Sequence, residues 1–235
     1  MTPTIVLVHG AFAESASWNG VIRSLQAASL DVVAVANPLR SLRGDAQYVR
    51  DVIAGIDAPV ILVGHSYGGM VITEAASDND AVKALVYVAA FAPEHGESAL
   101  QLSSQFPGST LGSALVSYPV ADGGKDLAIR PELFRRQFAA DVSEDETSLL
   151  AATQRPATEA ALAEGLQTQN PAWKTLPSWF VFGDQDQNIP VEAHRFAARR
   201  ARARWTREIA GVSHAVASSR PEDVAESIFE AVRAV

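Results

Sequence analysis

Residues 60–69, with the sequence VILVGHSYGG, decide the fold of this chain. The four apolar residues at their start are typical of a strand buried on both faces, as in a parallel sheet covered by helices. The residues after Gly69 have the composition of a helix. A serine at such a strand-to-helix turn adopts strained backbone angles, so the residues two positions away must be very small, as Gly64 and Gly68 are. The pattern predicts that Ser66 is a nucleophile held above the end of a sheet, beside the free amides of a helix N-terminus.

Apolar runs of strand length recur on both sides of this stretch, and helical patterns separate them. One such pattern places Trp18, Val21, Ile22 and Leu25 on a single helix face. Strands that alternate with helices predict right-handed crossovers and an open, doubly wound, mostly parallel sheet. The predicted strands cover residues 4–8, 31–36, 59–63, 83–89, 178–182 and 204–209.

The alternation stops between Pro93 and Trp173. This region contains helical segments and loops rich in glycine and proline, but no convincing pair of strands. An insertion between two sheet strands is most simply a lid over the carboxyl edge of the sheet, where doubly wound folds bind their ligands. The alternative is a helical decoration without that role. We expect a single domain over residues 1–235, with a helical cap at residues 93–173.

A serine nucleophile needs a base and an acid that orients the base. The predicted base is His214, because it lies in the loop GVSHA (211–215) between the last strand and the final helix. The other four histidines lie in glycine motifs, in the insertion or in a helical pattern: His9, His65, His95 and His194. The acid is expected in the loop GDQDQNIP (183–190), where Asp184 and Asp186 are both suitable and spacing alone does not separate them.

Acyl transfer also requires two backbone amides directed at the developing oxyanion. One is expected from Tyr67, directly after the nucleophile, and the other from Ala11, in the loop after the first strand. Phe12, Phe91 and Trp173 are aromatic candidates for a pocket wall. Such a wall favours neutral apolar or aryl esters over charged substrates.

On these motifs the chain resembles the α/β-hydrolase superfamily, and within it the small cofactor-independent esterases related to plant methylesterases and hydroxynitrile lyases. The resemblance spans nearly the whole chain. It rests on VLVHGA (6–11), GHSYGGM (64–70), GDQD (183–186) with Pro190, and GVSH (211–214). It implies an α/β-hydrolase fold with about six core strands and a cap that follows residues 91–93, before the strand that carries the acid.

The resemblance also bears on the chemistry. The acid of this superfamily tends to lie four residues before a proline, which favours Asp186 over Asp184. The related lyases carry a threonine and a lysine where this chain has Gly10 and Ala215. Without an ammonium group to hold a leaving cyanide, we expect hydrolysis rather than cyanohydrin cleavage.

Composition excludes several other classes of protein. The 19 Lys and Arg against 27 Asp and Glu give a net charge of −8, which argues against sequence-independent binding to nucleic acid. The chain has no cysteine, so a disulfide scaffold, a thiolate zinc site and a cysteine nucleophile are excluded. No stretch approaches the roughly 18 apolar residues of a membrane span, and the N-terminus lacks the pattern of a signal peptide. We expect a cytoplasmic protein with no nucleic-acid or membrane partner.

The sequence therefore predicts a serine carboxylic-ester hydrolase for small apolar or aryl esters. It would work through Ser66, His214 and Asp186 and an acyl-enzyme intermediate, with no metal or organic cofactor. The same three residues could instead serve lactone hydrolysis, carbon–carbon bond cleavage or perhydrolysis. A ligand receptor built on the same scaffold is an alternative from a different class.

Overall fold

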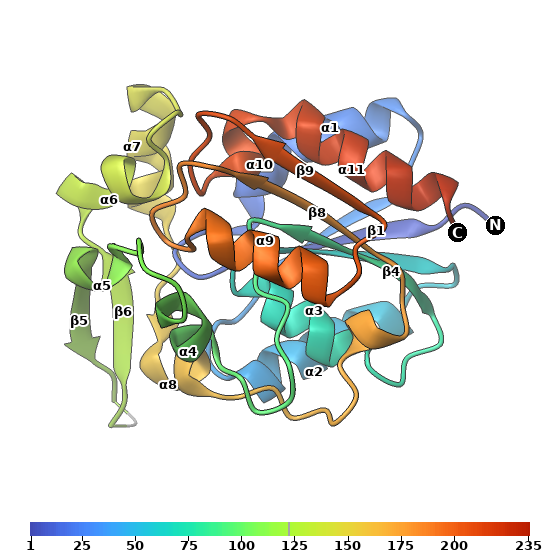
Figure 1. Ribbon diagram of the computed structural model, residues 1–235, viewed down its shortest axis with the longest axis horizontal. Coiled ribbons are helices and arrows are strands. Elements are labelled where there is room, and N and C mark those ends of the chain that lie inside the picture. The colour runs from blue at the N-terminus through green and yellow to red at the C-terminus, as the bar shows by residue number, and fades with distance from the viewer. Residues whose placement is uncertain (122) are drawn as a thin grey trace.

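The central element of the protein is a parallel six-stranded sheet, seen in a computed structural model that describes residues 1–121 and 123–235 (Figure 1). The strand order is β2-β1-β3-β4-β8-β9, and each neighbouring pair is parallel. This arrangement confirms the predicted α/β-hydrolase fold. The strands are β1 Thr4–Val8, β2 Val32–Val35, β3 Val60–His65, β4 Val82–Val88, β8 Ser178–Gly183 and β9 Trp205–Ile209.

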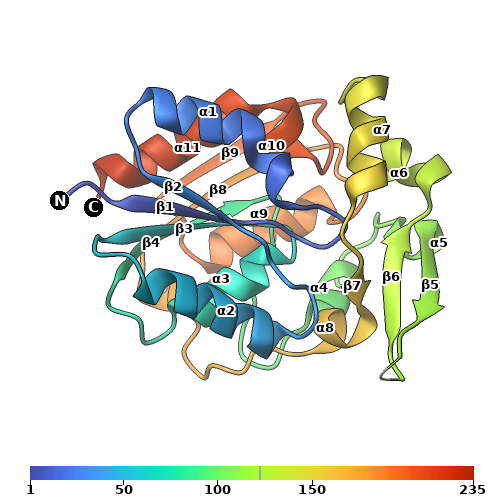
Figure 2. The same ribbon diagram turned by 180° about the vertical axis from the view of Figure 1, so that it is seen from behind.

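Helices cover both faces of the sheet, so its central strands are buried on both sides. Helices α1 (Asn19–Ala27) and α11 (Pro221–Arg233) lie on one face, with the short segments η1 (Ser15–Trp18) and α10 (Val216–Ser219) beside them. The opposite face carries α2 (Leu42–Ala54), α3 (Gly68–Ala76) and α9 (Val191–Arg200) (Figure 2). All nine residues of α3 are buried. Among the described residues, no helix has the length and apolar character needed to cross a bilayer.

The insertion between β4 and β8 gathers at the carboxyl end of the sheet (Figure 1). It contains strands as well as helices, which corrects the expectation of a purely helical segment at residues 93–173. β5, β6 and β7 form a small antiparallel sheet. The elements of the insertion are α4 Ala99–Ser104, α5 Leu111–Ala114, β5 Leu115–Pro119, β6 Lys125–Ile129, α6 Pro131–Phe138, α7 Glu144–Thr153, β7 Ala157–Thr158, α8 Glu159–Ala163 and η2 Ala172–Lys174.

Two carboxylates fasten the C-terminal part of the insertion to the core. Glu164 Oε2 accepts the amide of Leu42 at 2.6 Å, at the N-terminus of α2, where a negative charge is favourable. Glu74 Oε2, on α3, accepts the amides of Gln167 at 2.9 Å and Thr168 at 3.1 Å. The insertion is therefore anchored on the helices that flank the end of β3.

Candidate active site

Ser66 lies at the turn between β3 and α3, with a backbone φ of +55° in the left-handed region. Close contacts explain the glycines around it. A Cβ on Gly64 would lie 2.6 Å from the carbonyl oxygen of Gly68, and one on Gly68 would lie 2.4 Å from that of Val8. Any larger residue at either position would push the turn away from β1, so the strained conformation depends on both glycines.

The loop after β1 packs directly against this turn. A Cβ on Gly10 would lie 2.6 Å from Ser66 Cβ and 3.2 Å from the amide nitrogen of Tyr67. Within the described residues, neither the Ala11 amide nor the Tyr67 amide has a hydrogen-bond acceptor. Two donors without an acceptor therefore lie in the loop after β1 and in the nucleophile turn that this loop contacts, as an oxyanion site requires.

His214 and Asp186 form a buried pair on two neighbouring loops. His214 Nδ1 lies 2.6 Å from Asp186 Oδ2, and both side chains are almost completely shielded from solvent. Asp184 has a different role, because its Oδ1 accepts the amide of Gly211 at 2.7 Å and braces the loop that leads to His214. Of the two candidate aspartates, the structure brings only Asp186 to the histidine.

The electrostatics of the site favour an ionised acid. Burial alone would raise the pKa of Asp186, but the charge of His214 and the hydrogen bonds from His194 and His214 outweigh it and hold that pKa below its usual range. Burial, reinforced by the charge of His214, lowers the pKa of His65 to about 3. The neutral His65 ring donates through Nε2 to the carbonyl oxygen of His214 at 3.1 Å.

The Nε2 atom of His214 is buried and has no hydrogen-bond partner among the described residues. In the described structure, no hydrogen bond joins this nitrogen to Ser66. Its ring is held by the ring of His65, with centroids 4.7 Å apart, and by the edge of Phe138 at 4.9 Å. The nitrogen that a general base would use is therefore unoccupied within a fixed ring.

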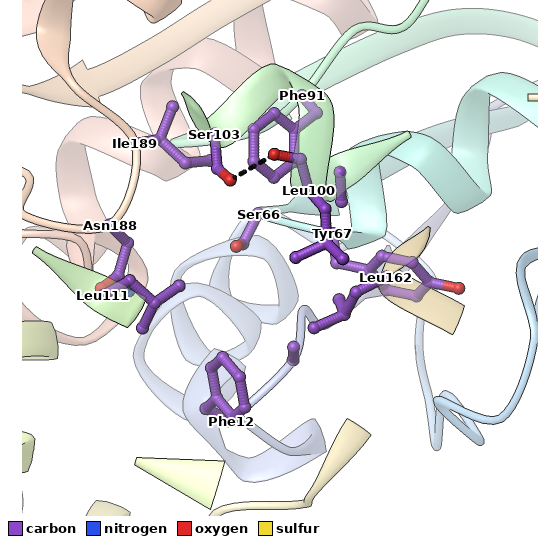
Figure 3. Close-up of a pocket in the computed structure, with 12 residues that line it drawn as sticks. Phe12, Ser66, Tyr67, Phe91, Leu100, Ser103, Leu111, Leu162, Asn188 and Ile189 are labelled. Atoms are coloured by element: carbon purple, nitrogen blue, oxygen red, sulfur yellow. Dashed lines mark hydrogen bonds between the residues drawn. The ribbon is translucent and has the colours of Figure 1, made fainter. Parts of the chain in front are cut away.

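A cavity with about 390 Å³ of empty volume opens at Ser66 (Figure 3). Its wall is mainly apolar, and no charged side chain lines it in the described structure. Two of the three predicted aromatic residues, Phe12 and Phe91, contribute to this wall. The lining residues are Ala11, Phe12, Ser66, Tyr67, Phe91, Ala99, Leu100, Ser103, Leu111, Leu162, Asn188 and Ile189.

Trp173 does not line this cavity, so the sequence-based assignment of that residue to the pocket wall is wrong. Its Nε1 donates to the carbonyl oxygen of Pro93 at 2.7 Å, and its ring lies beneath the cations of Lys174 and Arg200. These contacts hold the indole in a separate groove, where the insertion rejoins the core. Groups of three or more side chains arranged to bind a metal ion are absent from the described residues.

Three further residues support the site and were not singled out from the sequence. His194 Nε2 lies 3.0 Å from Asp186 Oδ2. Gln137 and Asp141, near the end of α6, bind the loops that carry Asp186 and His214, respectively. The only signal for His194 was a histidine on the helix that follows the acid loop. Gln137 and Asp141 are at least 45 residues from every residue of the proposed triad, and no sequence pattern pointed to them.

Comparisons with known proteins identify the family of this chain. The model of the alpha/beta hydrolase family matches residues 5–227. A carbendazim hydrolyzing esterase from Nocardioides sp. is 37% identical over 133 residues, which are 47% of this chain and 54% of that protein, so this match spans about half the length of the relative. Polyneuridine aldehyde esterase from Rauvolfia serpentina is 23% identical over 257 residues, covering 96% of this chain and 94% of the relative.

Solved structures resemble the whole fold. The crystal structure of polyneuridine aldehyde esterase has a TM-score of 0.82 at 20% identity and covers 98% of this chain and 99% of that one. The methylesterase protein MES16 from Arabidopsis has a TM-score of 0.83 at 18% identity and covers 99% of this chain and 100% of that one. At these identities the likeness concerns the fold.

Proposed function

Because this chain belongs to the alpha/beta hydrolase family and is a hydrolase of that family, we propose that it is a serine esterase with Ser66 as the nucleophile, His214 as the base and Asp186 as the acid. The observation that carries this proposal is the 2.6 Å hydrogen bond between His214 Nδ1 and Asp186 Oδ2, at the edge of the sheet where Ser66 lies. The relatives named as esterases support the same class of reaction.

The mechanism follows from the proton on His214. An ionised Asp186 can only accept, so Nδ1 of His214 carries the proton and Nε2 is free to act as a base. Rotation of the Ser66 side chain brings Oγ to Nε2, which takes its proton as Oγ attacks the ester carbonyl. His214 then returns the proton to the leaving alkoxide, and an acyl-enzyme remains. Water activated by the same nitrogen hydrolyses it and releases the carboxylic acid.

The amides of Ala11 and Tyr67 bind the oxyanion of both tetrahedral intermediates. Such a donor typically contributes about 3 kcal/mol to the transition state. The Tyr67 amide lies at the contact between the loop after β1 and the nucleophile turn, and Ala11 directly follows Gly10 in that loop. No reorganisation is needed when the charge develops.

The substrate class follows from the wall of the cavity. Because no charged side chain lines it in the described structure, a charged substrate would lose its hydration without compensation. Neutral apolar or aryl esters lose little hydration free energy when they enter it. The limited volume favours short acyl groups.

The insertion at residues 93–173 acts as a cap within a single domain of residues 1–235. It supplies five of the lining residues, among them Leu100 and Leu111, and so forms part of the cavity wall around Ser66 (Figure 3). A cap in this position excludes water from the acyl-enzyme until the alcohol has left.

The test is hydrolysis of p-nitrophenyl acetate and p-nitrophenyl butyrate by the wild type and by Ser66→Ala. We expect turnover by the wild type and near-complete loss in the variant. A fluorophosphonate probe should label the wild type on the peptide that contains Ser66 and leave the variant unlabelled. Equal hydrolysis by both proteins, or labelling of another residue, would refute the esterase mechanism.

A further inference from the structure

The acid of the proposed triad binds two histidines with one oxygen. Asp186 Oδ2 lies 2.6 Å from His214 Nδ1 and 3.0 Å from Nε2 of His194, which is buried on α9. The other oxygen, Oδ1, accepts the amides of Asn188 at 2.8 Å and Ile189 at 2.9 Å. The two amides belong to residues of the cavity wall (Figure 3).

The contacts of His194 define which nitrogen carries its proton. An ionised carboxylate only accepts hydrogen bonds, so Nε2 is the donor. Nδ1 is buried and has no partner among the described residues. A second proton on Nδ1 would be a buried donor without an acceptor, which costs free energy. These contacts favour the form of the ring with its proton on Nε2.

Packing fixes the direction of this donor. The imidazole of His194 stacks on the ring of Phe182 in β8, with centroids 4.8 Å apart and planes inclined by 19°. Phe182 lies four residues before Asp186, so the sheet itself sets the position of the ring relative to the carboxylate. The hydrogen bond to Asp186 does not depend on a mobile side chain.

We propose that His194 is a positioning residue for the reaction. It holds Oδ2 of Asp186 in the plane of the His214 ring and takes up part of the negative charge that His214 would otherwise receive. His214 consequently binds a proton less strongly than it would beside an acid with a single histidine partner. This inference rests on the proposed triad, because it assigns His194 a role through Asp186.

Several other charged or titratable groups lie around His214 and His194. His214 is faced by Asp186 and His65, and Asp141 binds the neighbouring Ser213. His194 is faced by Asp186, and Glu208 of β9 lies farther away. Glu208 is paired with Arg195, which also binds Glu192 on α9. None of these groups is altered by a substitution at position 194.

Two substitutions separate the donor from the ring. His194→Phe keeps a planar ring over Phe182 but removes the donor, whereas His194→Gln supplies an amide nitrogen near the place of Nε2 without the ring. The readout is kcat/KM for p-nitrophenyl acetate as a function of pH, because its acid limb reports protonation of the base in the free enzyme. We expect His194→Phe to move this limb to higher pH by about half a unit to one unit and to lower the plateau by about tenfold. His194→Gln should keep the limb within about 0.2 units of the wild type.

A role in packing alone would give a different pattern. Both variants would then lose activity without moving the acid limb, or His194→Gln would be the more damaged of the two. Either result would overturn the proposal. Thermal unfolding of both variants identifies any loss of folded protein.

A measurement on the wild type stands even if neither variant folds. In protein labelled with ¹⁵N at histidine, the ring of His194 should carry its proton on Nε2, and Nδ1 should have the shift of an unprotonated nitrogen. A proton on Nδ1 would overturn the proposal. This spectrum does not depend on turnover, so a failed triad, detected by an active Ser66→Ala variant, is distinguishable from a wrong assignment of His194.

Discussion

The Asp186 carboxylate receives hydrogen bonds from two histidine rings and two backbone amides while shielded from solvent. Asp186→Asn replaces one of its oxygens with an amide NH2 group that donates toward the His214 ring. Nδ1 of His214 then accepts, and its proton moves to Nε2, where it blocks the base. We expect kcat for p-nitrophenyl acetate to fall by about 10³- to 10⁴-fold, measured at neutral pH with the folded fraction checked by circular dichroism.

Asp184→Asn is the matched control from the same loop. Its Oδ1 can still accept the Gly211 amide, so the loop keeps its brace. The expected loss in kcat is less than about tenfold. The reverse ranking of the two variants would contradict the assignment of Asp186 as the acid.

At the scale of residues, the sequence predicts a site residue when neighbouring residues in the chain determine its role. It does not predict a site residue whose role depends on contacts between distant segments. Ser66 is predictable because the turn and its glycines are contiguous. Asp184 and Asp186 share a loop, and what separates them is which one faces the final loop, a property of the sheet. His194 requires the register of α9 against β8, which no local pattern contains.

At the scale of elements, the end of α6 holds both loops that carry the proposed acid and base. Gln137 Nε2 donates to Asn188 Oδ1 and to the carbonyl oxygen of Gln187, each at 2.8 Å. The carbonyl oxygen of Phe138 accepts the amide of Ala215 at 2.9 Å. Asp141 accepts the amide and the hydroxyl of Ser213. This end of the insertion is therefore part of the framework of the site as well as of the proposed cap.

This framework predicts that a cap residue outside the cavity controls activity. Asp141→Ala removes the acceptor for the backbone beside His214, and we expect kcat/KM to fall by about tenfold as the ring becomes less fixed. Asp141→Asn retains an oxygen for the same bonds and should stay within about threefold of the wild type. Steady-state kinetics on p-nitrophenyl acetate measure both. Wild-type kinetics in Asp141→Ala would show that the cap has no part in holding His214.

The elements themselves were predictable to different degrees. The six core strands were confirmed, and the central ones were the clearest, because continuous apolar runs mark strands that are buried on both faces. In contrast, most residues of β5 are exposed and β7 has two residues, so neither leaves a periodic pattern in the sequence. Their pairing depends on β6, which brings segments more than 25 residues apart into one sheet. The strands of the cap were missed for this reason.

At the scale of the whole molecule, the fold buries histidines that cannot ionise in place. Burial lowers the pKa of His9 to about 4 and that of His65 to about 3. Each ring donates to a backbone carbonyl: Nδ1 of His9 to Gly10, and Nε2 of His65 to His214. In the unfolded chain these two histidines have a pKa near 6.5. Below that pH they each bind a proton that they do not bind in the folded chain.

The free energy of unfolding must therefore fall as the pH drops below about 6.5, by roughly 1.4 kcal/mol per pH unit for each of these histidines, until the folded pKa is reached. His9→Asn and His65→Gln each retain a donor but cannot titrate, so each should make this slope shallower by about that amount. Asp45, whose pKa burial raises, acts in the opposite direction but is common to all three proteins. Urea denaturation between about pH 6 and pH 4.5 measures the slopes. Identical slopes in the wild type and both variants would mean that these rings are protonated in the folded protein.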